Sequence, residues 1–144
     1  MKHSPLLLLL AVALFGACNQ TPDANRQLQD EMIAIHDEVM PMMGTFVRDI
    51  QKIDTILLNL DDYKTANPDL DTAQQRVELT ELQNRLEKAH DSMNDWMHDL
   101  NLNFEGKSND EIKAYLEVEK TKMEEIKQEF IDVSETTEQT LDIY

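Results

Sequence analysis

Cysteine, glycine and aromatic residues are scarce in this sequence. Among 144 residues there are one cysteine, three glycines, four prolines and 6% aromatic residues. A single cysteine excludes a disulfide within the chain. The scarcity of glycine, combined with abundant Glu, Gln, Lys, Leu and Met, favours an all-helical fold.

Basic residues are also few. The sequence has 13 Lys and Arg residues against 29 Asp and Glu residues, which gives a formal net charge of −16. Nucleic-acid binding requires clustered Lys and Arg side chains for phosphate contacts, so this class of function is excluded. The length of the chain allows one domain.

Long hydrophobic runs are absent apart from one near the N-terminus. The run Leu6–Phe15 precedes two small residues, Gly16 and Ala17, and this pattern predicts a signal peptide over residues 1–17. A helix that spans a bilayer needs about twenty apolar residues, so the run is too short to be one.

Cys18 follows the run directly. The sequence Phe15-Gly16-Ala17-Cys18 resembles the bacterial lipobox, with Phe15 in place of the usual leucine. The resemblance implies cleavage before Cys18 and lipidation of that residue, which would anchor the protein to a membrane. The alternative is an ordinary secretory signal followed by an incidental cysteine. Either way, we expect the protein in the cell envelope, facing the periplasm or the cell exterior.

Three amphipathic segments follow a polar tether over residues 18–23. Their apolar residues recur every three or four positions, as in helices that pack along one stripe. The first stripe consists of Leu28, Met32, Ile35, Val39, Met42, Phe46, Ile50, Ile53, Leu57 and Leu60. The second consists of Leu79, Leu82, Leu86, Ala89, Met93, Trp96 and Leu100. The third consists of Ile112, Leu116, Glu119, Met123, Ile126, Phe130, Val133, Thr137 and Leu141.

Local signals predict where these helices end. Pro41 predicts a kink or a short break inside the first helix, because proline removes a backbone donor. Residues 61–70 contain Asn67-Pro68-Asp69 and are predicted to form a loop. Two capping boxes then predict the starts of the second and third helices: Asp71 with Gln74, and Ser108 with Glu111.

The predicted fold is an elongated, antiparallel three-helix bundle over residues 24–144, with up-down-up order and coiled-coil-like stripes. The polar residues 134–144 are expected to fray. A rod this thin leaves room for an envelope protein partner or a second copy of the chain.

Histidine and methionine are concentrated in the first two helices. Two sets each share one helical face: His36, Met40 and Met43 in the first helix, and His90, Met93 and Met97 in the second. Antiparallel pairing about a loop near residue 66 places facing residues at three levels: His36 with Met97, Met40 with Met93, and Met43 with His90.

Imidazole nitrogen and thioether sulfur form a soft, neutral ligand set that suits Cu(I). We therefore predict a Cu(I) site formed by these six residues. Trp96 flanks the site, where its ring can shield a monovalent cation. Asp37 can orient an imidazole, and His98 lies beside the set. In ligand types this resembles the Met/His/Trp sites of periplasmic copper chaperones, which are small β-barrels.

A second interpretation of the same residues is packing. Methionine commonly fills gaps in helical cores, and Trp96 occupies a core position of its stripe. The structural alternative is therefore an envelope scaffold whose His and Met residues serve only as core.

Other chemistry is poorly represented. Glu87-x-x-His90 matches one arm of a di-iron bundle site, but the helix over 24–60 has no such arm. The chain lacks the cavity lining expected for haem and has no serine in a strained glycine turn. We therefore expect a protein that is not an enzyme.

The lipobox, His36-Asp-x-x-Met40-Pro41-x-Met43 and Trp96-Met97-His98 together give a family resemblance. The chain resembles a group of small Bacteroidetes lipoproteins, some of which carry the label "viral A-type inclusion protein". The resemblance implies an envelope lipoprotein of coiled-coil composition and brings no established activity. The predicted function is metal sequestration, delivery or sensing at the His/Met site.

Overall fold

The computed structural model describes residues 22–144, which form four α-helices and no β-strand within that range. The helices are α1 (Pro22–Leu58), α2 (Leu60–Ala66), α3 (Thr72–Asp99) and α4 (Asn109–Leu141). The predicted all-helical class is confirmed. The predicted signal peptide and Cys18 lie outside the described residues.

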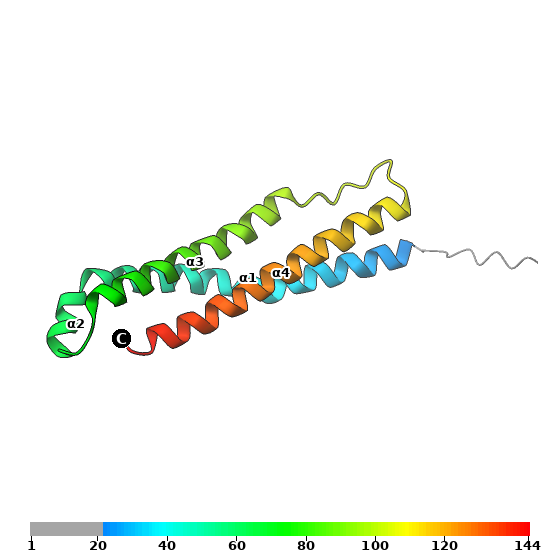
Figure 1. Ribbon diagram of the computed structural model, residues 1–144. Coiled ribbons are helices and arrows are strands. Elements are labelled where there is room, and N and C mark those ends of the chain that lie inside the picture. Colours follow the sequence, from blue (N-terminus) through cyan, green and yellow to red (C-terminus); the bar gives the residue numbers. More distant parts are fainter. Residues whose placement is uncertain (1–21) are drawn as a thin grey trace, which may run out of the picture.

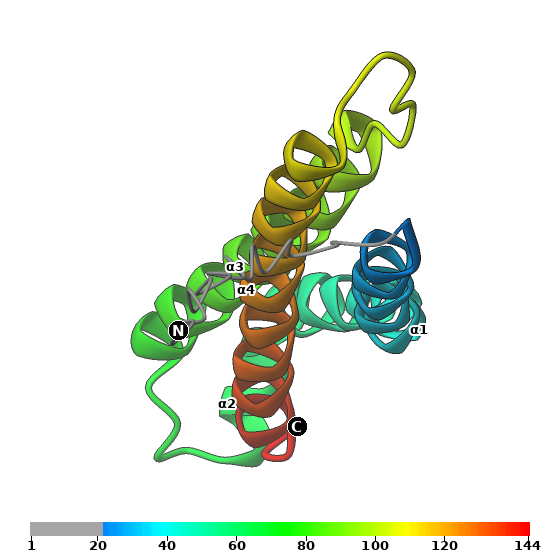
Figure 2. The same cartoon turned by 90° about the vertical axis from the view of Figure 1, so that its right-hand side faces the viewer.

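The three long helices lie side by side (Figure 1). The chain runs along α1, returns along α3 and runs forward again along α4, so α1 and α4 point the same way. Helix α4 packs against both α1 and α3, and Figure 2 shows it in front of α3 and beside the first half of α1. The start of α1 lies at the same end of the molecule as the loop between α3 and α4.

The predicted loop over residues 61–70 is wrong in its first half, because helix α2 occupies Leu60–Ala66. Two contacts explain this short helix. Leu60 is buried, and the ring of Tyr63 meets the ring of Tyr144 edge-on at 5.2 Å. A helix of seven residues is marginal by itself, so these tertiary contacts stabilise it.

Helix α1 continues without a break through Pro41. Pro41 is exposed, so the backbone position that loses its donor lies on the solvent side. The predicted break is therefore wrong, and the predicted kink stays a prediction.

The predicted stripes of α3 and α4 are largely confirmed by burial. In the second stripe the exception is Leu100, which follows α3 and is partly buried, and in α4 the exceptions are Ile112 and Ile126, which are also partly buried. The stripe of α1 is partly wrong, since Met43 and Ile56 are buried where Met42 and Leu57 were expected. Helix α1 packs against two helices, so its apolar face is wider than one stripe.

The helix caps lie at the positions that the sequence predicts. The Asp71 side chain accepts hydrogen bonds from two backbone N–H groups of α3, and Ser108 and Glu111 form a complete capping box at the start of α4. The side chain of Gln74 bonds Glu78 instead of returning to the cap.

The predicted fraying of residues 134–144 is wrong. Thr137 and Leu141 are buried, and the Tyr144 hydroxyl donates a hydrogen bond to Gln75 of α3 at 2.5 Å. The C-terminal end of α4 is therefore docked against the rest of the bundle.

Candidate functional site

One member of the first predicted His/Met set, His36, contacts α3. The rings of His36 and Trp96 are 5.7 Å apart and tilted by 34°. This contact places His36 within one residue of Met97, its predicted counterpart. Further along the same pair of helices, the Arg76 guanidinium lies 3.5 Å from the carbonyl oxygen of Leu57, in the same antiparallel register.

Burial divides the six predicted ligands into an inner and an outer group. Met93 is fully buried and Met43 is 9% exposed, so both belong to the hydrophobic core. Met97 is 36% exposed, and the side chains of His36 and His90 are 19% and 29% exposed. Met40 is partly buried. The outer group is therefore accessible to solvent, whereas the inner group packs like ordinary core.

The two histidines differ in their hydrogen bonds. Nδ1 of His36 lies 2.9 Å from the Asp37 carboxylate, which can only accept, so Nδ1 carries a proton. The lone pair of Nε2 is then free to bind a cation. Nδ1 of His90 lies 3.0 Å from the Nδ2 amide of Asn94, which donates. With Asn94 as the donor, Nδ1 of His90 accepts and its lone pair is occupied, and the Asp91 carboxylate lies 3.8 Å from the same nitrogen.

Asn94 is a residue that the sequence analysis missed. The signal was present, because Asn94 follows His90 by four positions and such residues are neighbours on a helix surface. His98 is exposed.

Trp96 is 5% exposed and lies between two different surroundings. Its ring lies against the ring of His36 in α1. Trp96 also lines a hollow between α3 and α4, together with Asp95, Asp99 and Glu119. The indole N–H is buried and has no hydrogen-bond partner among the described residues. Asp95 and Asp99 therefore belong to the α4 side and do not support the imidazole of His36.

Glu119 is the buried carboxylate of that hollow. It is 6% exposed and accepts a hydrogen bond from Lys122 at 2.8 Å. This hydrogen bond raises the pKa of Lys122 above its usual range. The negative charge of Glu119 is therefore balanced by a lysine of the same helix.

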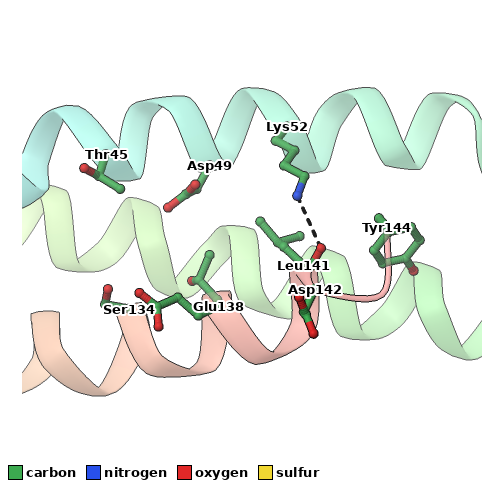
Figure 3. A pocket seen from close by; sticks show the side chains of 9 residues that line it. Thr45, Asp49, Lys52, Ser134, Glu138, Leu141, Asp142 and Tyr144 are labelled. Atoms are coloured by element: carbon green, nitrogen blue, oxygen red, sulfur yellow. Dashed lines mark hydrogen bonds between the residues drawn. The ribbon is translucent and has the colours of Figure 1, made fainter.

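Another hollow lies between α1 and the end of α4 (Figure 3). Its volume is about 550 Å³, and no predicted ligand lines it. The lining residues are Thr45, Asp49, Lys52, Ser134, Thr137, Glu138, Leu141, Asp142 and Tyr144. Lys52 donates a hydrogen bond to the Leu141 carbonyl at 3.2 Å, and burial raises the pKa of Asp49.

Carboxylates and imidazoles do not form a metal centre together in the part of the chain that the structure describes. No group of three or more His, Cys, Asp or Glu side chains is arranged there to hold a metal ion. Methionine sulfur is a different class of donor, and four of the six predicted ligands are methionines.

Protein-family models, curated proteins and solved structures were compared with the chain, and none of them matches it. Among residues 22–144, no helix has both the length and the apolar character needed to cross a membrane.

Proposed function

We propose that the protein is a lipid-anchored, non-enzymatic protein of the cell envelope that binds Cu(I) between α1 and α3. The observation that carries the proposal is the contact of the His36 and Trp96 rings at 5.7 Å, beside the exposed Met97. For the fold we propose an up-down-up bundle of α1, α3 and α4, extended by α2 and kinked in α1 near Pro41.

Three side chains supply the ligands in this proposal. They are Nε2 of His36 and the sulfur atoms of Met40 and Met97. Met40 lies one helical turn after His36, and Met97 is adjacent to Trp96. One imidazole and two thioethers form a soft, uncharged set that favours a monovalent cation of the copper type.

Supporting residues complete the site. Asp37 holds His36 in the tautomer that presents Nε2, and the face of Trp96 favours a cation beside it. Met43 and Met93 pack beneath as core, and Asn94 withholds His90 from the first coordination sphere. The exposure of Met97 leaves one ligand open to exchange, which suits metal delivery or sensing.

The burial of Met43, Met93 and Trp96 favours a second candidate function. In that alternative the protein is an acidic helical scaffold, and the His and Met residues only fill the core. The two functions make opposite predictions for metal affinity, so one titration separates them.

The test is a Cu(I) competition titration of the mature chain carrying Cys18→Ser. This background is needed because a free thiolate at Cys18 would itself bind Cu(I). We expect His36→Gln and Met97→Leu each to weaken Cu(I) binding by about tenfold or more. Met123→Leu, a core methionine of α4, and His98→Gln serve as matched controls and should leave affinity unchanged.

The single tryptophan gives a second measurement. Cu(I) or Ag(I) bound beside Trp96 should quench its fluorescence in proportion to occupancy. Equal affinity of wild type, His36→Gln and Met97→Leu, without quenching, would establish the scaffold alternative instead.

A further inference from the structure

We propose that the loop between α3 and α4, residues 100–108, contacts the surface of a phospholipid bilayer through Leu102. This inference rests on the proposed lipid anchor at Cys18 and is independent of the proposed metal site. It assigns an orientation to the bundle, with the α3–α4 loop next to the membrane and α2 away from it.

The loop lies beside the first turns of α1. Nδ2 of Asn25 in α1 donates a hydrogen bond to the carbonyl of Asn109, the first residue of α4, at 3.0 Å. Asn25 and Phe104 also line one small hollow together. Figure 1 shows the loop and the start of α1 at the same end of the molecule. Whatever holds the start of α1 near a surface therefore holds this loop near it as well.

Covalent geometry limits the distance between α1 and the anchor. Cys18 precedes Pro22 by four residues, and even a fully extended chain of that length spans only about 14 Å. The opposite end of α1 is roughly 55 Å away along the helix axis, because α1 has 37 residues. The lipidated cysteine thus selects which end of the rod meets the bilayer.

The loop has a fixed conformation. The backbone N–H of Asn101 donates to the Tyr115 hydroxyl, and the side-chain oxygens of Asn101 and Asn103 accept from the backbone N–H groups of Asn103 and Glu105. The ring of Phe104 packs edge-on against Tyr115 at 5.9 Å. These contacts provide hydrogen-bond partners for polar groups of the loop. Leu102 is left as the apolar residue of the loop that faces water.

Leu102 is 39% exposed, whereas Leu100 and Phe104 are packed against the core. A leucine held outward at this end can enter the interfacial region of a bilayer. The anchor makes the contact intramolecular, so a weak apolar contact is populated at the high effective concentration that a short tether gives.

Charge indicates which lipid surface fits. The chain carries a net charge of −16, whereas the loop itself has one acidic and one basic residue, Glu105 and Lys107. Like charges repel across a short distance from the membrane. The fitting surface is therefore a zwitterionic one, such as phosphatidylcholine, and not an anionic one.

The experiment uses the mature, lipidated protein with Leu102→Cys. Lipidation blocks the thiol of Cys18, the only native cysteine, so a nitroxide spin label reacts at position 102 alone. The protein is reconstituted into phosphatidylcholine vesicles, and collisions of the label with oxygen and with a water-soluble nickel chelate are measured. The matched control is Leu58→Cys, which is 85% exposed at the far end of α1.

A second reference is the soluble mature chain carrying Cys18→Ser with Leu102→Cys. From this soluble form to the vesicles, we expect oxygen collisions at position 102 to rise and nickel collisions to fall. The label at position 58 should stay accessible to water in both. Circular dichroism of each variant checks that the helices are intact.

Three outcomes overturn the proposal in distinguishable ways. An acylated, vesicle-bound protein whose position 102 is as accessible to nickel as position 58 excludes the loop contact and leaves the anchor standing. A mass spectrum that shows unmodified Cys18, together with protein that stays in the supernatant, excludes the proposed anchor. Protection of position 102 already in the soluble form shows that a second copy covers the loop.

Discussion

The rings of Phe46 in α1 and Phe130 in α4 stack with their centroids 4.6 Å apart, and both side chains are fully buried. The stack lies inside a parallel pair of helices with a regular register. Lys120 bonds Glu31, Lys127 bonds Glu38, and Leu141 accepts from Lys52, and each pair is separated by 89 residues.

The first two contacts of this series are one heptad apart and the last two are two heptads apart, which matches the repeat of a coiled coil. At the same separation, the level between Glu38 and Lys52 is occupied by Thr45 and Ser134. Both side chains are too short to bridge the helices, and both line the hollow of Figure 3. The hollow is therefore the gap left where the series of long, paired side chains is interrupted.

The aromatic stack is the first target for mutation. Phe130→Ala should lower the free energy of unfolding by about 3–5 kcal/mol, because it removes a buried ring and leaves a cavity. Urea denaturation followed by circular dichroism measures the loss. Val118→Ala, at a position 53% exposed in the same helix, should change stability by less than about 0.5 kcal/mol. Similar losses for both variants would contradict the assignment of Phe130 to the core.

The contact between Glu31 and Lys120 should depend on salt and pH. The hydrogen bond from Lys120 lowers the pKa of Glu31, so its stabilisation is present above the unfolded pKa and is lost as pH falls through the lower folded value. Lys120→Glu should lower the melting temperature by about 2 °C at low salt and less in high salt.

The control for this pair is the double reversal Glu31→Lys with Lys120→Glu. It restores opposite charges at the same positions and should recover most of the lost melting temperature at low salt. A double variant no more stable than the single one would show that the pair contributes nothing specific.

Asp49 should destabilise the fold at neutral pH. Burial raises the pKa of its carboxyl, and the charge of Glu138 raises it further, while Arg48 and Lys52 oppose the shift. Because the pKa of Asp49 is higher in the folded state, its ionisation lowers the free energy of unfolding as pH rises through the folded-state pKa. This loss is absent below the unfolded-state pKa of about 4.

Asp49→Asn removes that cost. We expect a melting temperature about 2 °C higher than wild type at pH 7, with no difference near pH 3.5. Differential scanning calorimetry at both pH values makes the comparison. A gain that is equal at both values would point to packing instead of charge.

The two methionines of α3 should divide into a core residue and a surface residue. Met93→Ala should cost about 2–5 kcal/mol of unfolding free energy, because Met93 is fully buried. Met97→Ala should cost less than about 0.5 kcal/mol, because Met97 is 36% exposed. Chemical denaturation without metal tests this, and a large loss for Met97→Ala would assign it to packing.

Much of the fold could be predicted from local patterns. Asp71 and Ser108 cap the helices that they were expected to start, and the apolar stripes of α3 and α4 are buried nearly as predicted. These features depend on residues within a few positions of one another, so spacing alone specifies them. Of the candidate site, only the level of His36 can be compared: its ring meets Trp96, one residue from the expected Met97, and the ligand set stays a prediction.

Features that depend on distant residues were decided only by tertiary structure. Helix α2 forms because Tyr63 meets Tyr144, and the C-terminal turn is ordered because Tyr144 bonds Gln75. Periodicity also could not say that α1 packs on two helices, which buries Met43 in place of Met42. The sequence by itself thus determined the helices, their caps and the level at which His36 faces α3. Burial, which requires all three long helices together, decided that Met97 is open while Met93 is core.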